Sequence, residues 1–107
     1  MGYAIFMHLR TTPAWLSLSR EARRDIATPA FAGALAGSGV AFRYFDAEAF
    51  HGRCTDIALF ETEDIWAYYC VVERLRDSRL FSTPYFEVVE IVMSVEEGFR
   101  AFEAQEA

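Results

Sequence analysis

The sequence predicts a ferredoxin-like α+β sandwich, with the order strand, helix, strand, strand, helix, strand and then a short C-terminal helix. Four short apolar segments, near residues 3–9, 40–47, 55–61 and 85–93, have the length and the aromatic or β-branched content of strands. Helical segments separate the first strand from the second and the third from the fourth. Two such split halves form one four-stranded antiparallel sheet with both long helices on one face. At 107 residues, the chain has the size of a single domain spanning residues 1–107.

The first strand is apolar on both of its alternating faces, which is typical of a strand covered on both sides. The helical region that follows has two start signals. Thr12 is a good N-cap before Pro13, and Ser19 with Glu21 offers a second start, so two helical pieces are expected. Pro29 is expected to interrupt the second piece, because proline cannot donate to the preceding turn.

The second long helix is expected to be capped by Thr62, with Glu63 and Asp64 in its first turn and Arg74 and Arg76 in its last. A single buried stripe is expected to hold Ile65, Tyr68, Tyr69, Val72 and Leu75.

The terminal helix is predicted from the run Ser94 to Glu97, which has the spacing of a capping box. Val95, Phe99 and Phe102 are expected to line it.

The composition excludes several classes of protein. The formal net charge is −6, and all ten basic residues are arginines without a basic block, so a nucleic-acid binder is not expected. No apolar run approaches the ~18 residues needed to span a bilayer, and no secretory signal is recognisable, so the chain is expected to be cytoplasmic and without membrane contact. Cys54 and Cys70 lack CxxC spacing and are interpreted as buried thiols.

The strands also predict an oligomer. All four are apolar on both sides, whereas two helices cover only one side of the sheet. Left bare, the second face would be an unusually large apolar patch for a monomer. The prediction is a C2 homodimer, sheet facing sheet, with twice the 12.2 kDa mass of one chain.

The candidate site is placed on the open face of the sheet, on the side of the first strand that carries Phe6, His8 and Arg10. His8 is the candidate proton-handling group, and Arg43 is the candidate clamp for a carboxylate, phenolate or carbonyl. Alternatively, His8 is a hydrogen-bonded core residue and Arg43 a structural ion-pair partner of Asp56 or Glu87. The candidate ligand-binding residues are Phe6, Arg10, Phe45, Asp56, Phe60 and Glu87, with Tyr44, Asp46 and Tyr85 as second choices because strand parity could be off by one.

No cofactor and no metal are predicted. Asp46, Glu48 and Asp56 are near one another in sequence, but no HxH or HExxH spacing accompanies them. No phosphate-binding glycine loop, serine elbow or dinucleotide fingerprint occurs either.

Five segments of the chain together carry a resemblance to a known family; they are Thr12–Glu21, Phe42–Phe50, Gly52–Ala58, Phe60–Asp64 and Pro84–Val89. As a set they resemble the darcynin family, which consists of small bacterial proteins of uncharacterised function. The resemblance implies a layout like that of dimeric α/β-barrel proteins, a group with small monooxygenases, polyketide cyclases, isomerases and haem-handling proteins. It therefore supports the fold and leaves the activity open.

Three functions remain open from the sequence. The first is the binding of a small hydrophobic or aromatic molecule in a cleft on the open face of the sheet. The second is a cofactor-free or haem-assisted enzyme acting on such a molecule. The third is a structural dimerisation module without a ligand.

Overall fold

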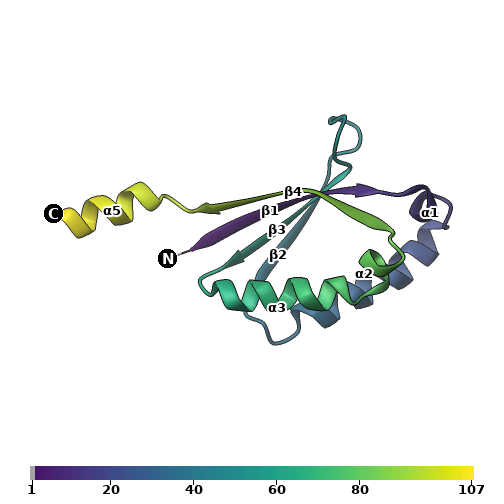
Figure 1. Cartoon of the computed structure of the whole chain (residues 1–107), viewed down its shortest axis with the longest axis horizontal. Coiled ribbons are helices and arrows are strands. Elements are labelled where there is room, and N and C mark those ends of the chain that lie inside the picture. Colours follow the sequence, from purple (N-terminus) through teal and green to yellow (C-terminus); the bar gives the residue numbers. More distant parts are fainter. Residues whose placement is uncertain (1) are drawn as a thin grey trace.

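A four-stranded antiparallel sheet with the strand order β2-β3-β1-β4 forms the centre of the computed structural model, which describes residues 2–107 (Figure 1). The strands are β1 (Tyr3–Thr11), β2 (Ala41–Asp46), β3 (Asp56–Thr62) and β4 (Phe86–Val95). The helices are α1 (Pro13–Leu16), α2 (Arg20–Leu35), α3 (Ile65–Arg76), α4 (Arg79–Ser82) and α5 (Gly98–Glu106). This is the ferredoxin-like arrangement that the sequence predicts, with strand ends within three residues of the expected ones.

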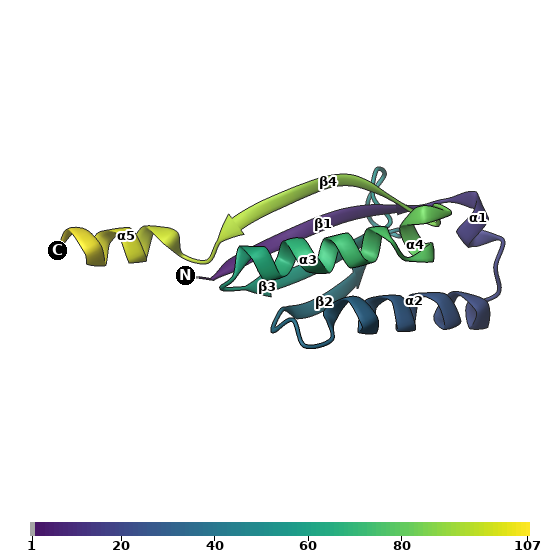
Figure 2. The same cartoon turned by 60° about the horizontal axis from the view of Figure 1, so that its bottom comes forward.

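Both long helices lie on one side of the sheet, which we call the helix side; the opposite side is the open face (Figures 1 and 2). On the helix side, α2 packs on β2 through the stacked rings of Phe31 and Phe42, with centroids 4.9 Å apart. In the same layer α3 packs on β3, where the rings of Phe60 and Tyr68 meet edge to face at 5.5 Å.

The strand register assigns each side chain to one side of the sheet, because directly paired residues of antiparallel strands point the same way. Ile5, Met7 and Leu9 of β1 are buried on the helix side. Their β3 partners are Phe60, Ala58 and Asp56, which in turn pair with Phe42, Tyr44 and Asp46 of β2. In a single chain the two central strands, β1 and β3, are mostly buried or half-buried, whereas most of the edge strands β2 and β4 is exposed.

The helical region after β1 is split as expected, with the side chains of Thr12 and Ser19 capping α1 and α2. However, α2 continues through Pro29, so the predicted interruption is wrong. The proline and Asp25, whose carbonyl would have accepted an N–H at this position, both lie on the exposed side of the helix, where water can replace the missing bond.

The predicted start of α3 is wrong by two residues. Asp64 is the N-cap, and its carboxylate accepts hydrogen bonds from the backbone N–H groups of Trp66 and Ala67. Thr62 instead accepts a bond from the N–H of Asp64, so it supports the cap without being it. The predicted stripe is rotated as well: Tyr68, Val71 and Leu75 are buried in α3, whereas Ile65 and Tyr69 are exposed. The basic last turn, Arg74 and Arg76, is confirmed.

The capping box predicted at residues 94–97 does not form. Ser94 still belongs to β4, and its hydroxyl donates to the carbonyl of Ala4 across the sheet. Glu97 is the N-cap of α5, at a left-handed φ of 45° and without a side-chain capping bond. The terminal helix itself is confirmed, but it runs outward from the end of the sheet and none of its residues is buried (Figure 1).

Candidate functional site

The larger of the two described pockets lies on the helix side of the sheet, between α1, α2 and the ends of β2 and β3. Its volume is about 730 Å³. Four aromatic side chains form its apolar wall. They are Trp15, Phe31, Phe42 and Phe86, drawn from α1, α2, β2 and β4. Its rings pack on one another in pairs, with Trp15 and Phe86 edge to face and Phe31 and Phe42 stacked, both at 4.9 Å.

Acidic groups form one part of the rim. Asp46, Glu48 and Asp56 line the pocket, and one carboxylate oxygen from each lies within 4.8 Å of the others. The β2–β3 register creates this cluster, since it pairs Asp46 directly with Asp56 where the two strands meet the connecting loop. Such a set of oxygens suits a hard cation or a ligand ammonium group.

Asp56 is the most unusual member of this cluster, because its carboxylate is charged in ordinary surroundings but only 7% of the residue is exposed here. Its pKa is raised from 3.8 to about 6, mainly by burial. Hydrogen bonding to Tyr44 lowers the pKa and so offsets part of this rise, whereas the charges of Asp46 and Glu48 contribute to it. Burial raises the pKa of Tyr44 strongly, and the charge of Asp56 adds to this increase. Tyr44 therefore stays a neutral hydroxyl beside a carboxyl group that titrates near neutral pH.

Arginines of α2 form another part of the rim, through Arg20 and Arg23. The guanidinium of Arg23 donates to the carbonyls of Trp15 and Leu16, at 3.2 and 2.9 Å. These carbonyls belong to the C-terminal end of α1, where a helix lacks internal partners. Arg23 thus fixes α1, and with it Trp15, against α2.

The register places six of the predicted site residues on the open face, as expected. These are Phe6, His8, Arg10, Arg43, Phe45 and Glu87. Asp56 and Phe60 are on the opposite side, so the prediction of their side was wrong. Asp56 reaches the rim of the helix-side pocket, and Phe60 is fully buried in the core.

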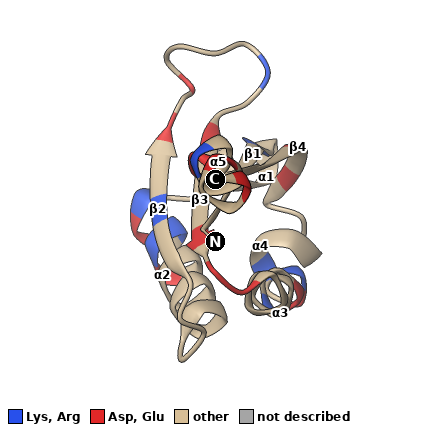
Figure 3. Ribbon diagram, turned by 90° about the vertical axis from the view of Figure 1, so that its left-hand side faces the viewer, with Lys and Arg blue, Asp and Glu red and all other residues tan. Residues whose placement is uncertain are grey.

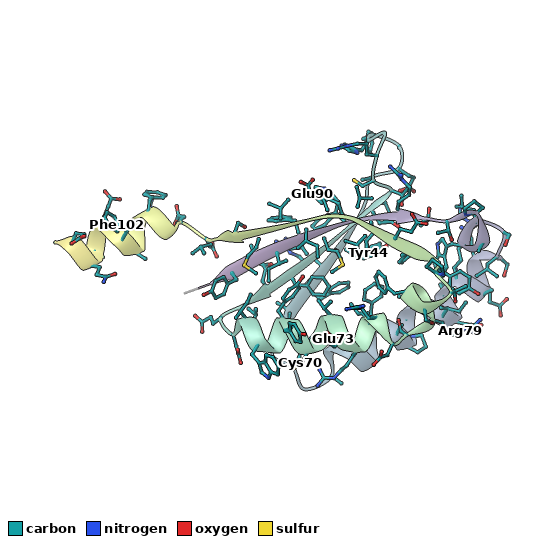
Figure 4. All side chains as sticks on the ribbon, viewed as in Figure 1. Tyr44, Cys70, Glu73, Arg79, Glu90 and Phe102 are labelled. Carbon is teal, nitrogen blue, oxygen red and sulfur yellow. The ribbon has the colours of Figure 1, made fainter. Side chains whose placement is uncertain are left out.

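The two residues expected to act together, His8 and Arg43, do not meet. Strand β3 lies between their strands, and neither residue lines either of the two pockets described within residues 2–107. His8 lies 3.8 Å from Glu90, and Arg43 lies 3.3 Å from Glu61. The structural alternative for Arg43 is therefore the better one, although its carboxylate partner is neither Asp56 nor Glu87. Figure 4 shows Glu90 on the open face and Tyr44 on the helix side.

Two of the second choices, Tyr44 and Asp46, do line the pocket together with Asp56. The third, Tyr85, is buried against Trp15, with ring centroids 5.5 Å apart. The sequence interpretation missed the aromatic wall and the two arginines of α2. Glu48 was considered only as a metal ligand, although its place two residues after Asp46 was a usable signal.

The donors in the pocket do not fit haem ligation by histidine, cysteine or methionine. None of these residue types is among the pocket residues within the described chain, and Tyr44, the one phenol, is held beside Asp56. Both cysteines are free thiols, but Cys70 is only half-buried. Among residues 2–107, no helix is long and apolar enough to cross a membrane.

The fold and pocket define an α+β domain of ferredoxin-like layout that has an aromatic cavity with an acidic rim. The chain belongs to the Darcynin family, because residues 2–107 match the family model described as "Darcynin, domain of unknown function". A Darcynin from the bacterium Chromobacterium violaceum is 54% identical over 66 residues, which are 62% of this chain and 84% of that protein. A Darcynin homolog from Streptomyces avermitilis is 36% identical over 96 residues, 88% of this chain and 78% of that protein.

Solved structures share the fold. A putative chlorite dismutase superimposes with a TM-score of 0.73 at 23% identity, over 87% of this chain and 44% of that one. A variant of the chlorite dismutase from Candidatus Nitrospira defluvii superimposes with a TM-score of 0.72 at 20% identity, over 85% of this chain and 38% of that one. This chain thus spans less than half the length of each, and the similarity concerns the fold alone.

Proposed function

We propose that the protein binds a small molecule with an aromatic or apolar body and a basic group, in the pocket between α2 and the sheet. One observation carries the proposal: a cavity of about 730 Å³ has an aromatic wall and three clustered carboxylates on its rim. This volume is within the range of roughly 300–1,000 Å³ that is usual for small-ligand sites.

The aromatic wall supplies the affinity for the ligand body. Trp15 and Phe42 present ring surface that an apolar molecule would cover, and covering it removes apolar area from water. Because the Trp15 ring packs on the rings of Tyr85 and Phe86, little side-chain freedom remains to be lost on binding.

The acidic rim supplies the selectivity. An ammonium group beside Asp46 and Asp56 would neutralise two carboxylates that now repel one another, whereas a carboxylate ligand would add a third charge of the same sign. Arg20 and Arg23 give the rim a cationic side as well, so a zwitterionic ligand also fits this charge pattern.

The test uses the two tryptophans, since Trp15 lines the pocket and Trp66 is exposed on α3. Trp66→Phe leaves Trp15 as the only indole reporter. Titration with phenethylamine should change its fluorescence saturably, and phenylacetate, matched in size, should bind at least about 10-fold more weakly. Adding Asp46→Asn should remove this preference, and Glu87→Gln on the open face is the matched control. Equal affinity for both probes, or none for either, would overturn the proposal.

A second candidate is a cofactor-free enzyme that moves a proton on the same ligand. The observation favouring it is Asp56, whose pKa of about 6 suits a general base near neutral pH. In this case Tyr44, held as a neutral hydroxyl, would donate a hydrogen bond to the developing oxyanion. Exchange of carbon-bound hydrogen in deuterated water, lost in Asp56→Asn, would separate this function from binding alone.

The protein is proposed to act as a cytoplasmic homodimer that joins through the open face. The centre of this face is apolar, with Phe6, Phe45 and Val92 partly exposed. Around it lie Arg10, Arg43 and His8 against Glu61, Glu87 and Glu90. In a chain of net charge −6, this near balance favours a second copy over a strongly charged partner. Light scattering that gives a single-chain mass at micromolar concentration would contradict it.

A further inference from the structure

The C-terminal helix α5 stands away from the rest of the molecule. Within residues 2–107 it has no extensive packing on another helix or strand, and it points outward along the long axis (Figures 1 and 2). Phe99 and Phe102 are 61% and 62% exposed, one helical turn apart on the same side. An isolated helix of nine residues is marginal in water, because it lacks tertiary packing. A surface that covered Phe99 and Phe102 would stabilise this helix.

The sheet has an apolar surface that lacks a helix. On the helix side of β4, Ile91 and Met93 pair with Met7 and Ile5, yet Met93 is 52% exposed. Helix α3 lies over β3, and the short α4 packs only on the start of β4, at Phe86, so the rest of this edge strand has no helix over it (Figure 2). We call Val88, Ile91 and Met93 the β4 strip.

The side of α3 nearest this strip is apolar as well. Arg74 of α3 donates to the carbonyl of Ala34, which fixes the side of α3 that faces α2. Helical periodicity puts Ile65, Tyr69 and Val72 on the other side, toward β4. Ile65 and Tyr69 are exposed there. A helix lying on the β4 strip would thus contact both the strand and α3.

We infer that α5 of one copy packs on the β4 strip of a second copy, and that the two copies exchange these helices reciprocally. In the observed shape, α5 cannot pack on the β4 strip of its own chain, because it leads away from that strip (Figures 1 and 4). Every chain carries both the helix α5 and the β4 strip. In a two-fold symmetric dimer, both helices and both strips are therefore occupied. This inference concerns an interface and does not depend on the proposed ligand.

Charge favours a second copy over an unrelated partner. Glu106 lies on the same side of α5 as Phe99 and Phe102, by helical periodicity. The corresponding end of α3 is basic, with Arg76 on the side toward β4 and Arg79 following in α4 (Figure 3). An α5 docked parallel to α3 would place Glu106 near these arginines.

Disulfide trapping tests the contact directly. Two variants are made in a Cys70→Ser background. The first combines Ile91→Cys with Phe102→Cys, and the second combines Met93→Cys with Phe99→Cys. Under mild oxidation at least one pair should give a disulfide-linked dimer on a non-reducing gel. Replacing the helix partner by Ala104→Cys, on the opposite side of α5, is the control and should give at least about 10-fold less dimer.

A second measurement guards against failure of the chosen pairs. Phe99→Glu with Phe102→Glu should raise the dissociation constant of the oligomer at least about 10-fold, by concentration-dependent light scattering. Ala104→Glu should not change it, and the unfolding midpoint of the dissociated chain should not move. If the double variant and the unsubstituted protein had the same dissociation constant, the inference would be overturned. Disulfides found only within single chains would overturn it too, because they would show α5 folding back on its own strip.

Discussion

The helix side and the open face of the same sheet differ in how completely one chain covers them. On the helix side α2 and α3 bury the core, including Phe60, and a cavity of about 730 Å³ remains beside α1 and α2. On the open face, Phe45 and Val92 remain 44% and 41% exposed in a single chain. Both faces are built from similar apolar residues, so the number of apolar side chains does not decide which face becomes a core. The position of the helices does.

The difference also separates two kinds of polar group. Ionisable groups on the helix side are buried enough for the pKa of Asp56 to rise to about 6. On the open face the charged pairs are solvated, as the half-exposed pair of Arg43 and Glu61 shows. Chemistry that needs a shifted pKa therefore has its best location on the helix side, and self-association has its best location on the open face.

The largest effect expected from this comparison concerns two phenylalanines in neighbouring strands. Phe60 is 0% exposed and packs on Phe42 and Tyr68, with centroids 5.3 and 5.5 Å away. Phe60→Ala should lower the free energy of unfolding by about 3–5 kcal/mol, because it leaves a cavity in the core. This loss of stability is measured by urea unfolding at a protein concentration below the dissociation constant of the oligomer, where the chains are separate.

Phe45→Ala is the matched control on the open face, where the ring is 44% exposed in one chain. Its cost should be under about 1 kcal/mol for the dissociated chain. If the two substitutions destabilised the chain equally, the two faces would not differ in packing as described.

A smaller effect is expected from the buried acid. The pKa of Asp56 is about 6 in the folded chain and 3.8 in the reference state, so the folded chain binds the proton more tightly. Stability is therefore lost as pH rises from about 4 to 6, where the unfolded chain is already deprotonated. Asp56→Asn should raise the free energy of unfolding at pH 7 on the order of 2 kcal/mol, and the gain should vanish below about pH 3.8.

Chemical denaturation at a series of pH values measures this gain. Asp64→Asn is the control acid, because Asp64 is exposed at the cap of α3. A gain for Asp56→Asn that does not depend on pH would show that the carboxylate is not the cause.

The sequence predicted the strands well because each is a short apolar run with a turn signal at its end. The helix starts were harder. Thr62 and Asp64 are both good caps two residues apart, and the choice depends on which of them the chain orients toward the free N–H groups of α3. The continuation of α2 through Pro29 depends on the exposure of that side of the helix, which the sequence alone does not determine.

The site was harder still, because it depends on pairing across strands. Asp46 and Asp56 meet only because β2 and β3 pair in one register, and a slip of one residue would turn either side chain to the other face. The sequence therefore could not decide whether Tyr44 and Asp46, or Arg43 and Phe45, face the ligand, because the two pairs lie on opposite faces of β2. The aromatic wall could not be predicted at all, since it requires α1 and α2 to be placed over the end of the sheet.

The smallest expected effect concerns the charges at the rim of the open face. Arg43 pairs with Glu61 at 3.3 Å, and its guanidinium lies 5.8 Å from the centre of the Phe45 ring. Both partners are solvated, so Arg43→Glu should change the free energy of unfolding of the dissociated chain by less than about 1 kcal/mol. The same change should weaken self-association measurably, since it makes the rim of the open face strongly acidic on both copies. Light scattering across a dilution series measures that association, and exchanging the two charges with Glu61→Arg in the same chain should restore it. If Arg43→Glu left the association unchanged, the open face would not be the interface, and its exposed apolar residues would require a different partner.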